Sequence, residues 1–227
     1  MSLSMFESGL YGRLRLQAGS HWHEYVSHPF VQQLAAGTLP QAAFRRYLTQ
    51  DYLFLVHFAR AYALLVSKLQ NLSEMRAAHT SLSAILNELP LHIRYCQQWG
   101  LTESAIMEVE EAAETVNYTR YVLDVGHSGD ALDLLTALMP CVAGYAEIGL
   151  RLLSDPETVF VNNAYGPWMA NYGDENYLAG VQSSLALFEK MACQRGGESR
   201  FTQLSSIFTT ATRLESAFWQ MGLDARS

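Results

Sequence analysis

The sequence predicts an all-α protein: one domain built as a bundle of about eight helices. Apolar residues between Phe44 and Leu69 recur at steps of three and four, the period of a helix with one buried face. Sustained alternation of polar and apolar residues, the pattern of a half-buried strand, does not occur. No composition break, repeat or low-complexity linker divides the 227 residues, so we expect residues 1–227 to form a single domain.

The first half of the chain carries helix punctuation at two places. Gly37 followed by Pro40 is typical of one helix ending and the next beginning. Ser73 and Glu74 predict another helix start, with a capping hydroxyl and an anion in the first turn, where the helix dipole favours negative charge.

The second half predicts one buried helix and two further starts. The segment from Asp130 to Leu153 is apolar nearly all round, so we expect a central helix. Asp155-Pro156 has the pattern of a cap before a first-turn proline and predicts another helix. Gly196-Gly197 should separate the last helix, which we expect from about Ser199 to Gly222.

Composition and charge restrict the classes of partner. Hydrophobic residues make up 49% of the chain and charged residues only 16%, where about 25% is usual. Few charges are therefore left to cover a monomer's surface, which predicts a homo-oligomer. The formal net charge of −7 and the scattered basic residues provide no basic face for phosphate, so we expect no nucleic-acid partner.

The three cysteines, Cys96, Cys141 and Cys193, form no disulfide or metal-finger spacing and favour a reducing compartment. Met1 to Tyr11 lacks the basic and apolar regions of a secretory signal. The most apolar uncharged run, Leu134 to Ala146, is shorter than the roughly 20 residues that cross a bilayer. We therefore expect a cytoplasmic protein with no membrane partner.

Two carboxylates, Asp51 and Glu215, lie in apolar helical stretches with aromatic residues three or four positions away on the same face. A buried carboxylate needs a hydrogen-bond donor, from the protein or from a ligand. Flat rings beside a carboxylate suit a flat heterocycle with N–H groups. The alternative is an ion pair inside the bundle.

Cys141 shares a helix face with Tyr145, and the pattern leaves its role open between an inert core thiol and a nucleophile. Tyr118 and Tyr172 lie near segment ends, where a tyrosine either packs or serves a site. The Glu-x-x-His pairs of di-iron bundles, the phosphate-binding glycine loops and G-x-S-x-G are absent, so we expect no metal, nucleotide or serine-hydrolase chemistry.

An ordered set of short motifs spans residues 20 to 222 and resembles the TenA (thiaminase II) family. The matching stretches are His28-Pro29-Phe30, Gly37-Thr38-Leu39-Pro40, Gln50-Asp51-Tyr52, His57-Phe58-Ala59, Glu88-x-x-x-His92, Pro140-Cys141, Tyr145-x-Glu147-x-Gly149, Tyr172-Gly173 and Glu215-x-x-Phe218-Trp219. The resemblance implies a haem-oxygenase-like helical bundle, a homotetramer and a pocket within each subunit. It also implies hydrolysis of thiamine, or of 4-amino-5-aminomethyl-2-methylpyrimidine, to the hydroxymethylpyrimidine, with no cofactor.

By matched position, the resemblance implies four catalytic residues. Cys141 places the chain in the cysteine-bearing branch, and its thiolate would add to the pyrimidine ring so that the ring can expel the leaving group. This requires either a lowered thiol pKa or a neighbour that removes the proton. Glu215 would protonate the departing amine or the ring and later activate water. Tyr118 and Tyr145 would orient the thiol and Glu215.

Three further residues are implied in substrate binding. Asp51 would accept hydrogen bonds from the amidine-like edge of the ring, a planar two-point contact. Tyr172 and Phe54 would sandwich the ring. The chain departs from the family at Phe54, where many relatives have tyrosine, and at Asp174, where a glycine is frequent. These changes bear on rate and substrate preference.

Two other function classes remain open. The first is a non-catalytic protein that binds a pyrimidine and regulates a partner, because members of the family have been labelled transcriptional activators. The second, an oxidase or oxygenase on the same fold, would need a metal or haem ligand set that the sequence does not contain.

Overall fold

The computed structural model describes residues 3–225, and over that range it contains helices and no strand. The elements are η1 (Leu3–Phe6), α1 (Gly9–Ala18), α2 (Ser20–Val26), α3 (Pro29–Ala35), α4 (Gln41–Lys68), α5 (Leu72–Gln98), α6 (Glu103–Glu108), α7 (Ala113–Ser128), α8 (Ala131–Ser154), α9 (Gly166–Tyr172), α10 (Glu175–Gln194) and α11 (Phe201–Leu223). The all-α prediction is confirmed. The helices outnumber the predicted eight because short helices such as α2, α3, α6 and α9 lie between the long ones.

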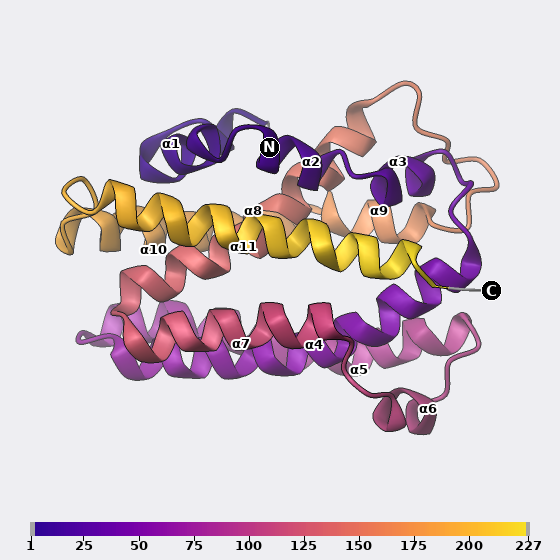
Figure 1. Ribbon diagram of the computed structural model, residues 1–227, viewed down its shortest axis with the longest axis horizontal. Coiled ribbons are helices and arrows are strands. Elements are labelled where there is room, and N and C mark those ends of the chain that lie inside the picture. The colour runs from indigo at the N-terminus through magenta and orange to yellow at the C-terminus, as the bar shows by residue number, and fades with distance from the viewer. Residues whose placement is uncertain (1–2, 226–227) are drawn as a thin grey trace.

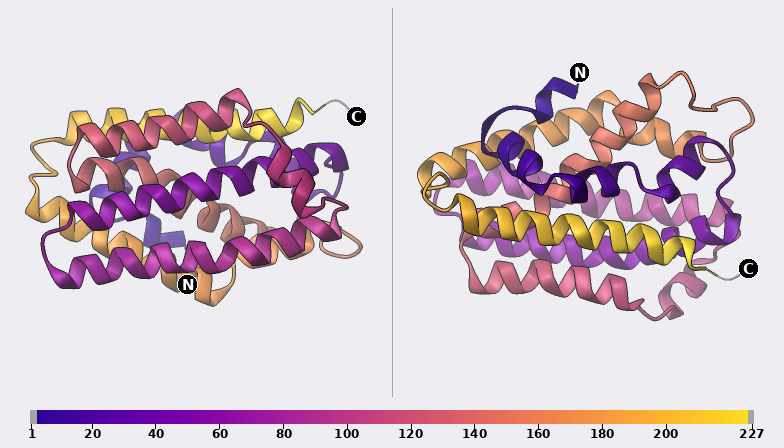
Figure 2. Two further views of the ribbon diagram at one scale, coloured as in Figure 1. Left: turned by 90° about the horizontal axis from the view of Figure 1, so that it is seen from below. Right: turned by 45° about the horizontal axis from the view of Figure 1, so that its top comes forward.

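The long helices form a bundle around α8. Helices α4 and α5 form an antiparallel hairpin, and α7 packs beside α4, so that α5, α4 and α7 lie side by side (Figure 2, left). Helix α11 lies between this layer and the N-terminal helices and packs against α8, α7 and α2 (Figure 1). Helix α8 contacts α7, α9, α10 and α11, which makes it the centre of the molecule.

The central helix α8 is apolar because it is buried. Its most apolar stretch has a mean hydropathy of 1.4, and by length and composition alone the 24-residue helix could cross a membrane. The sequence prediction considered only the uncharged run from Leu134 to Ala146, which is one part of this helix. In this structure the helix is instead a core helix, since 89% of its most apolar stretch lies inside the protein. The prediction of a central, buried helix is confirmed.

Several helix starts follow the predicted capping chemistry. Gly37 has a φ of 72°, which favours glycine, and α4 begins just after Pro40. Asp130 and Asp133 form a capping box at the start of α8, each carboxylate accepting a backbone N–H of the other residue. The start near Ser73 is shifted, since the cap of α5 is Asn71, whose Oδ1 accepts the Glu74 N–H at 3.0 Å.

The helix predicted after Asp155-Pro156 does not form. Asp155 Oδ1 accepts the Glu157 N–H at 2.9 Å, the bond of a helix cap, but the chain continues as turns up to α9. The residues that follow include Val159 and Val161, whose β-branched side chains disfavour helix. The prediction was wrong because an aspartate makes the same local bond in a turn as in a cap.

One buried ion pair ties the N-terminal helices to α8. Arg15 on α1 donates two hydrogen bonds of 2.8 Å to Glu147, and Trp22 Nε1 donates a third at 3.1 Å. The Glu147 side chain is only 3% exposed. Without Arg15, this carboxylate would be a buried charge without its cation.

We expect Arg15→Ala to lower the free energy of unfolding by about 3 kcal/mol, the cost of breaking a buried pair by removing one partner. Urea denaturation followed by circular dichroism measures this. The matched control is Arg13→Ala on the same helix, whose partner Glu198 is 78% exposed, and which should leave the free energy of unfolding nearly unchanged. Equal losses in the two variants would contradict a structural role for the buried pair.

Candidate active site

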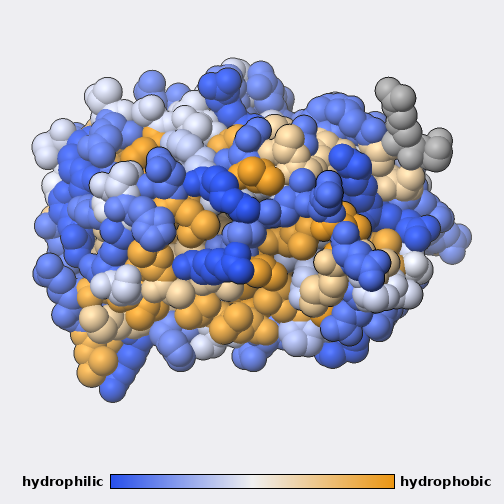
Figure 3. Space-filling model, turned by 60° about the horizontal axis from the view of Figure 1, so that its bottom comes forward, coloured by the Kyte–Doolittle hydropathy of each residue, from blue (hydrophilic) through white to orange (hydrophobic). Residues whose placement is uncertain are grey.

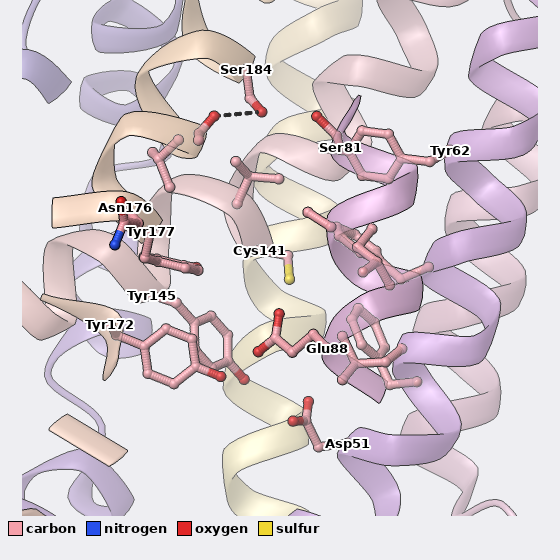
Figure 4. A pocket seen from close by; sticks show the side chains of 18 residues that line it. Asp51, Tyr62, Ser81, Glu88, Cys141, Tyr145, Tyr172, Asn176, Tyr177 and Ser184 are labelled. Carbon is pink, nitrogen blue, oxygen red and sulfur yellow. Dashed lines mark hydrogen bonds between the residues drawn. The ribbon is translucent and has the colours of Figure 1, made fainter. Parts of the chain in front are cut away.

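A cavity of about 200 Å³ lies beside Cys141 and is lined by residues of helices α4, α5, α8, α9 and α10. It is lined by five of the seven residues that the sequence singled out: Asp51, Phe54, Cys141, Tyr145 and Tyr172. Figure 4 shows the sulfur of Cys141 directed into this space, with Tyr145 and Tyr172 on one side. The helices therefore bring together residues that are far apart in the sequence.

Local packing explains how α8 presents Cys141. The preceding residue, Pro140, accepts a hydrogen bond from the Tyr25 hydroxyl on its carbonyl oxygen at 3.3 Å. That contact needs Gly144, because a Cβ there would lie 2.3 Å from the Tyr25 ring. One face of α8 is thus held against α2. Cys141 is half-buried rather than fully buried because it borders the cavity.

The other two predicted residues, Glu215 and Tyr118, lie behind the cavity wall. Glu215 on α11 is 1% exposed and accepts a hydrogen bond of 2.8 Å from the Tyr118 hydroxyl on α7. Neither residue lines the cavity. The Glu215 carboxylate is, however, close enough to the Cys141 thiol for each group to shift the pKa of the other. It therefore reaches the cavity through that thiol.

Burial sets the acidities of these groups. It raises the pKa of Glu215 to about 8, with the Asp51 charge acting in the same direction and the Tyr118 hydrogen bond opposing it. Burial, followed by the charges of Glu215 and Asp51, raises the pKa of the Cys141 thiol well above its usual value. Of the two ways to activate the thiol, a lowered pKa is thus wrong for this site. A neighbouring base must take the proton.

Among the described residues, the Asp51 carboxylate has a single hydrogen-bond donor, Tyr47. Tyr47 donates to Asp51 Oδ2 at 3.4 Å, and Tyr47 in turn accepts a hydrogen bond from Trp168 Nε1 at 3.3 Å. Burial raises the pKa of Asp51 to about 7. The carboxyl group can therefore either donate or accept a proton near neutral pH.

His92 Nδ1 lies 3.8 Å from Asp51 Oδ2, but the neutral imidazole ring brings no positive charge to the Asp51 carboxylate. Its Nε2 lies 2.9 Å from the Leu48 carbonyl oxygen, so Nε2 carries the proton in the tautomer that makes this bond. Burial lowers the His92 pKa and keeps the ring neutral. Within residues 3–225, neither Asp51 nor Glu215 forms an ion pair with lysine or arginine, so the alternative of a structural ion pair is not found.

The sequence did not assign a role to Glu88, which also lines the cavity. In Figure 4 its carboxylate lies between the sulfur of Cys141 and the carboxylate of Asp51. A second cavity of about 460 Å³ adjoins the first and shares Asp51, Glu88 and Tyr172 with it. The available signal was the four-residue spacing of Glu88 and His92, which puts both on one face of α5.

Charge and shape define what this site can hold. Neither cavity is lined by a lysine or arginine among the described residues, whereas both are lined by carboxylates. Aromatic rings form much of the wall, and Tyr145 and Tyr172 lie with ring centroids 4.9 Å apart. The site suits a small, flat, neutral or cationic ring with N–H donors.

Known proteins share this chain's sequence and fold. An uncharacterised protein of Haemophilus influenzae is 42% identical over 92% of this chain and 96% of its own length. A protein of Halalkalibacterium halodurans named aminopyrimidine aminohydrolase is 33% identical over 90% of this chain and 91% of its own length. The crystal structure of a TenA family transcription regulator from a Silicibacter species is 42% identical and covers 98% of this chain and 100% of its own, with a TM-score of 0.92.

The fold extends beyond close relatives. A Shewanella denitrificans domain with a haem-oxygenase-like fold is only 12% identical, yet it superposes over 92% of this chain and 89% of its own, with a TM-score of 0.72. The predicted haem-oxygenase-like bundle is therefore confirmed. The sequence pattern of the TENA/THI-4/PQQC family matches residues 15–225. The chain belongs to the TENA/THI-4/PQQC family.

Proposed function

We propose that this protein is a thiamine-salvage hydrolase that converts 4-amino-5-aminomethyl-2-methylpyrimidine, or thiamine, to the hydroxymethylpyrimidine. The observation that carries the proposal is a thiol, Cys141, that opens onto a ring-lined cavity and is backed by a buried carboxylate, Glu215. The name of the Halalkalibacterium halodurans relative, aminopyrimidine aminohydrolase, supports this chemistry.

In this proposal Asp51 binds the amidine-like edge of the ring. One carboxyl oxygen accepts from the 4-amino group, and the other shares a proton with the adjacent ring nitrogen. The pKa of about 7 suits this contact, because the shared proton can reside on either partner. Phe54 and Tyr172, both on the cavity wall, pack against the faces of the ring.

The reaction starts at the thiol. Glu215 takes the proton of Cys141, and the sulfur adds to an electron-poor ring carbon while a ring nitrogen receives that proton. The electron-rich ring then expels the leaving nitrogen with its bonding electrons. Tyr118 holds Glu215 by its 2.8 Å hydrogen bond, and Tyr145 orients the thiol side of the ring.

Water completes the cycle. It adds to the exocyclic methylene carbon and gives a proton to Glu215. The carbon–sulfur bond then breaks, the pair returns to sulfur, and the ring nitrogen loses its proton as aromaticity is restored. The thiol regains one proton, the released ammonia takes the other, and every residue is back in its starting state.

We expect Asp51→Ala to weaken binding of hydroxymethylpyrimidine by roughly ten- to a hundredfold, the effect of losing a hydrogen bond to a charged group. Asp51→Asn should fall between this variant and the wild type, because an amide keeps one donor and one acceptor. Isothermal titration calorimetry gives the Kd, and Asp124→Ala, an exposed position on α7, is the control. An unchanged Kd in Asp51→Ala would show that the recognition edge is elsewhere.

A second candidate function is a pyrimidine-binding regulator without catalysis, favoured by the name of the Silicibacter structure. Product analysis separates the two. The hydrolase releases ammonia from the aminomethyl compound or thiazole from thiamine, and parallel reactions rank the two leaving groups. A regulator binds the pyrimidine and releases neither.

The proposal extends to assembly and location: a cytoplasmic, single-domain protein that forms a homotetramer and binds neither membrane nor nucleic acid. The apolar side chains on the face of α4, α5 and α7 support an oligomer (Figure 3). Leu72 and Leu86 on α5 are 59% and 51% exposed. Light scattering tests this, and a mass of one 25.4 kDa chain would contradict it.

A further inference from the structure

Among the residues that the structure describes, Glu88 is the one cavity-lining carboxylate without a hydrogen-bond donor. Asp51, which lines the same cavity, has Tyr47 as a donor, and Glu215, behind the cavity wall, has Tyr118. Glu88 has no hydrogen-bond or ion-pair partner within residues 3–225. Its carboxylate nevertheless points into the cavity between Cys141 and Asp51 (Figure 4).

The surroundings of Glu88 lack a protein cation. No lysine or arginine among the described residues lines either cavity. His92, one helical turn away, is held neutral by burial and uses Nε2 on the Leu48 carbonyl. Partial burial and the nearby Asp51 charge raise the pKa of Glu88. A ligand that brings a donor or a positive charge to this carboxylate gains a charge-assisted hydrogen bond that the protein does not supply.

We propose that Glu88 is the subsite for the leaving nitrogen, where it binds the ammonium of the aminomethyl substituent; this inference rests on the proposed function. A primary ammonium has three N–H donors, whereas a ring-substituted thiazolium nitrogen has none. Glu88 therefore selects amine-bearing pyrimidines over thiamine. Asp51 and Glu88 recognise opposite ends of the same substrate.

This assignment gives the two carboxylates separate tasks: Glu88 binds the leaving nitrogen, and Glu215 transfers protons. An ammonium held by Glu88 already carries three protons, so it departs with the carbon–nitrogen bonding pair as neutral ammonia. No acid is needed at that atom. Glu215 is then free to manage the proton of Cys141, which agrees with its position behind the thiol and away from the cavity.

Two ligands that differ in charge test the subsite. In a Cys141→Ser parent, calorimetry would compare the aminomethylpyrimidine, a cation, with the neutral hydroxymethylpyrimidine. Adding Glu88→Gln should weaken binding of the cation by roughly ten- to a hundredfold and change binding of the neutral ligand by less than about threefold. The matched control, Glu175→Gln, removes the same charge from an exposed residue at the start of α10 that lines neither cavity.

The outcomes are distinct. Equal weakening of both ligands, or no weakening of either, overturns the role of Glu88 while leaving the proposed function in place. Wild-type protein that releases neither ammonia from the aminomethyl compound nor thiazole from thiamine overturns the proposed function and the subsite together, and a Cys141→Ser parent that binds neither ligand overturns the subsite as drawn. In the wild-type background, Glu88→Gln should also lower kcat/KM for the aminomethyl compound by more than for thiamine. Thermal melts of each variant show whether the fold is retained.

Discussion

We expect Cys141→Ser to remove measurable turnover of the aminomethylpyrimidine and to change the Kd of hydroxymethylpyrimidine by less than about threefold. A serine hydroxyl fills nearly the same space, so the cavity keeps its shape. It is a far weaker nucleophile than a thiol, and Glu215 cannot remove its proton at neutral pH. Ammonia release gives the turnover, and calorimetry gives the Kd.

The matched control for this variant is Cys193→Ser. Cys193 is exposed on α10 and lines neither cavity, so its loss should leave turnover unchanged. Persisting turnover in Cys141→Ser would contradict covalent addition of this sulfur to the ring. Loss of pyrimidine binding in the same variant would show that the residue shapes the cavity rather than reacting.

Glu215→Gln should lower kcat by roughly 10² to 10⁴, the usual contribution of a positioned acid–base group. The amide keeps the size of the side chain and accepts the Tyr118 hydrogen bond, but it cannot take the thiol proton. Single-turnover kinetics measure the loss at the chemical step. A decrease of less than tenfold would mean that another group removes the proton of Cys141.

The pH dependence of kcat tests the same role of Glu215 as the base. A base with a pKa of about 8 is charged only above that pH, so kcat of the wild type should rise with pH and level off above 8. In Glu215→Gln this rise should disappear. Tyr118→Phe removes the hydrogen bond that lowers the Glu215 pKa, so the rise should move to higher pH. A profile unmoved by Tyr118→Phe would contradict the assignment of the rise to Glu215.

The periodicity of the sequence was sufficient to predict the helices that build the core. Residues from Phe44 to Leu65 recur at helical spacing and do form the buried face of α4, and the apolar segment after Asp130 is the central helix. The local sequence signal at Asp155 was misleading, because the same side-chain hydrogen bond to the backbone occurs in helix caps and in turns. Asp155 caps a turn with that bond, and only the weak preference of Val159 and Val161 against helix favoured the turn.

The site was predictable in part, for a physical reason. Asp51 and Cys141 lie in apolar stretches, so each is conspicuous in its own helix. Glu88 lies in a segment of α5 that mixes polar and apolar residues. Its place in the cavity wall follows only from the packing of α5 against α4 and α10. Whether a residue such as Glu215 lines the cavity or lies behind its wall depends on how helices pack, which spacing within one helix does not encode.

The acidity of the thiol also depended on tertiary structure. The sequence left open whether the Cys141 pKa would be lowered or a base would be needed. Carboxylates from α4, α5 and α11 converge on the sulfur, and together with burial they raise its pKa. A catalytic thiol in this site would therefore need a base, and Glu215 is the residue proposed for that role.

The most direct measurement of the central claim is a product balance. Purified protein is incubated with 4-amino-5-aminomethyl-2-methylpyrimidine, and ammonia and hydroxymethylpyrimidine are quantified together. We expect equal amounts of the two products, formed over many turnovers without an added cofactor. Tight binding of the pyrimidine with neither product formed would contradict hydrolysis and leave a binding protein in its place.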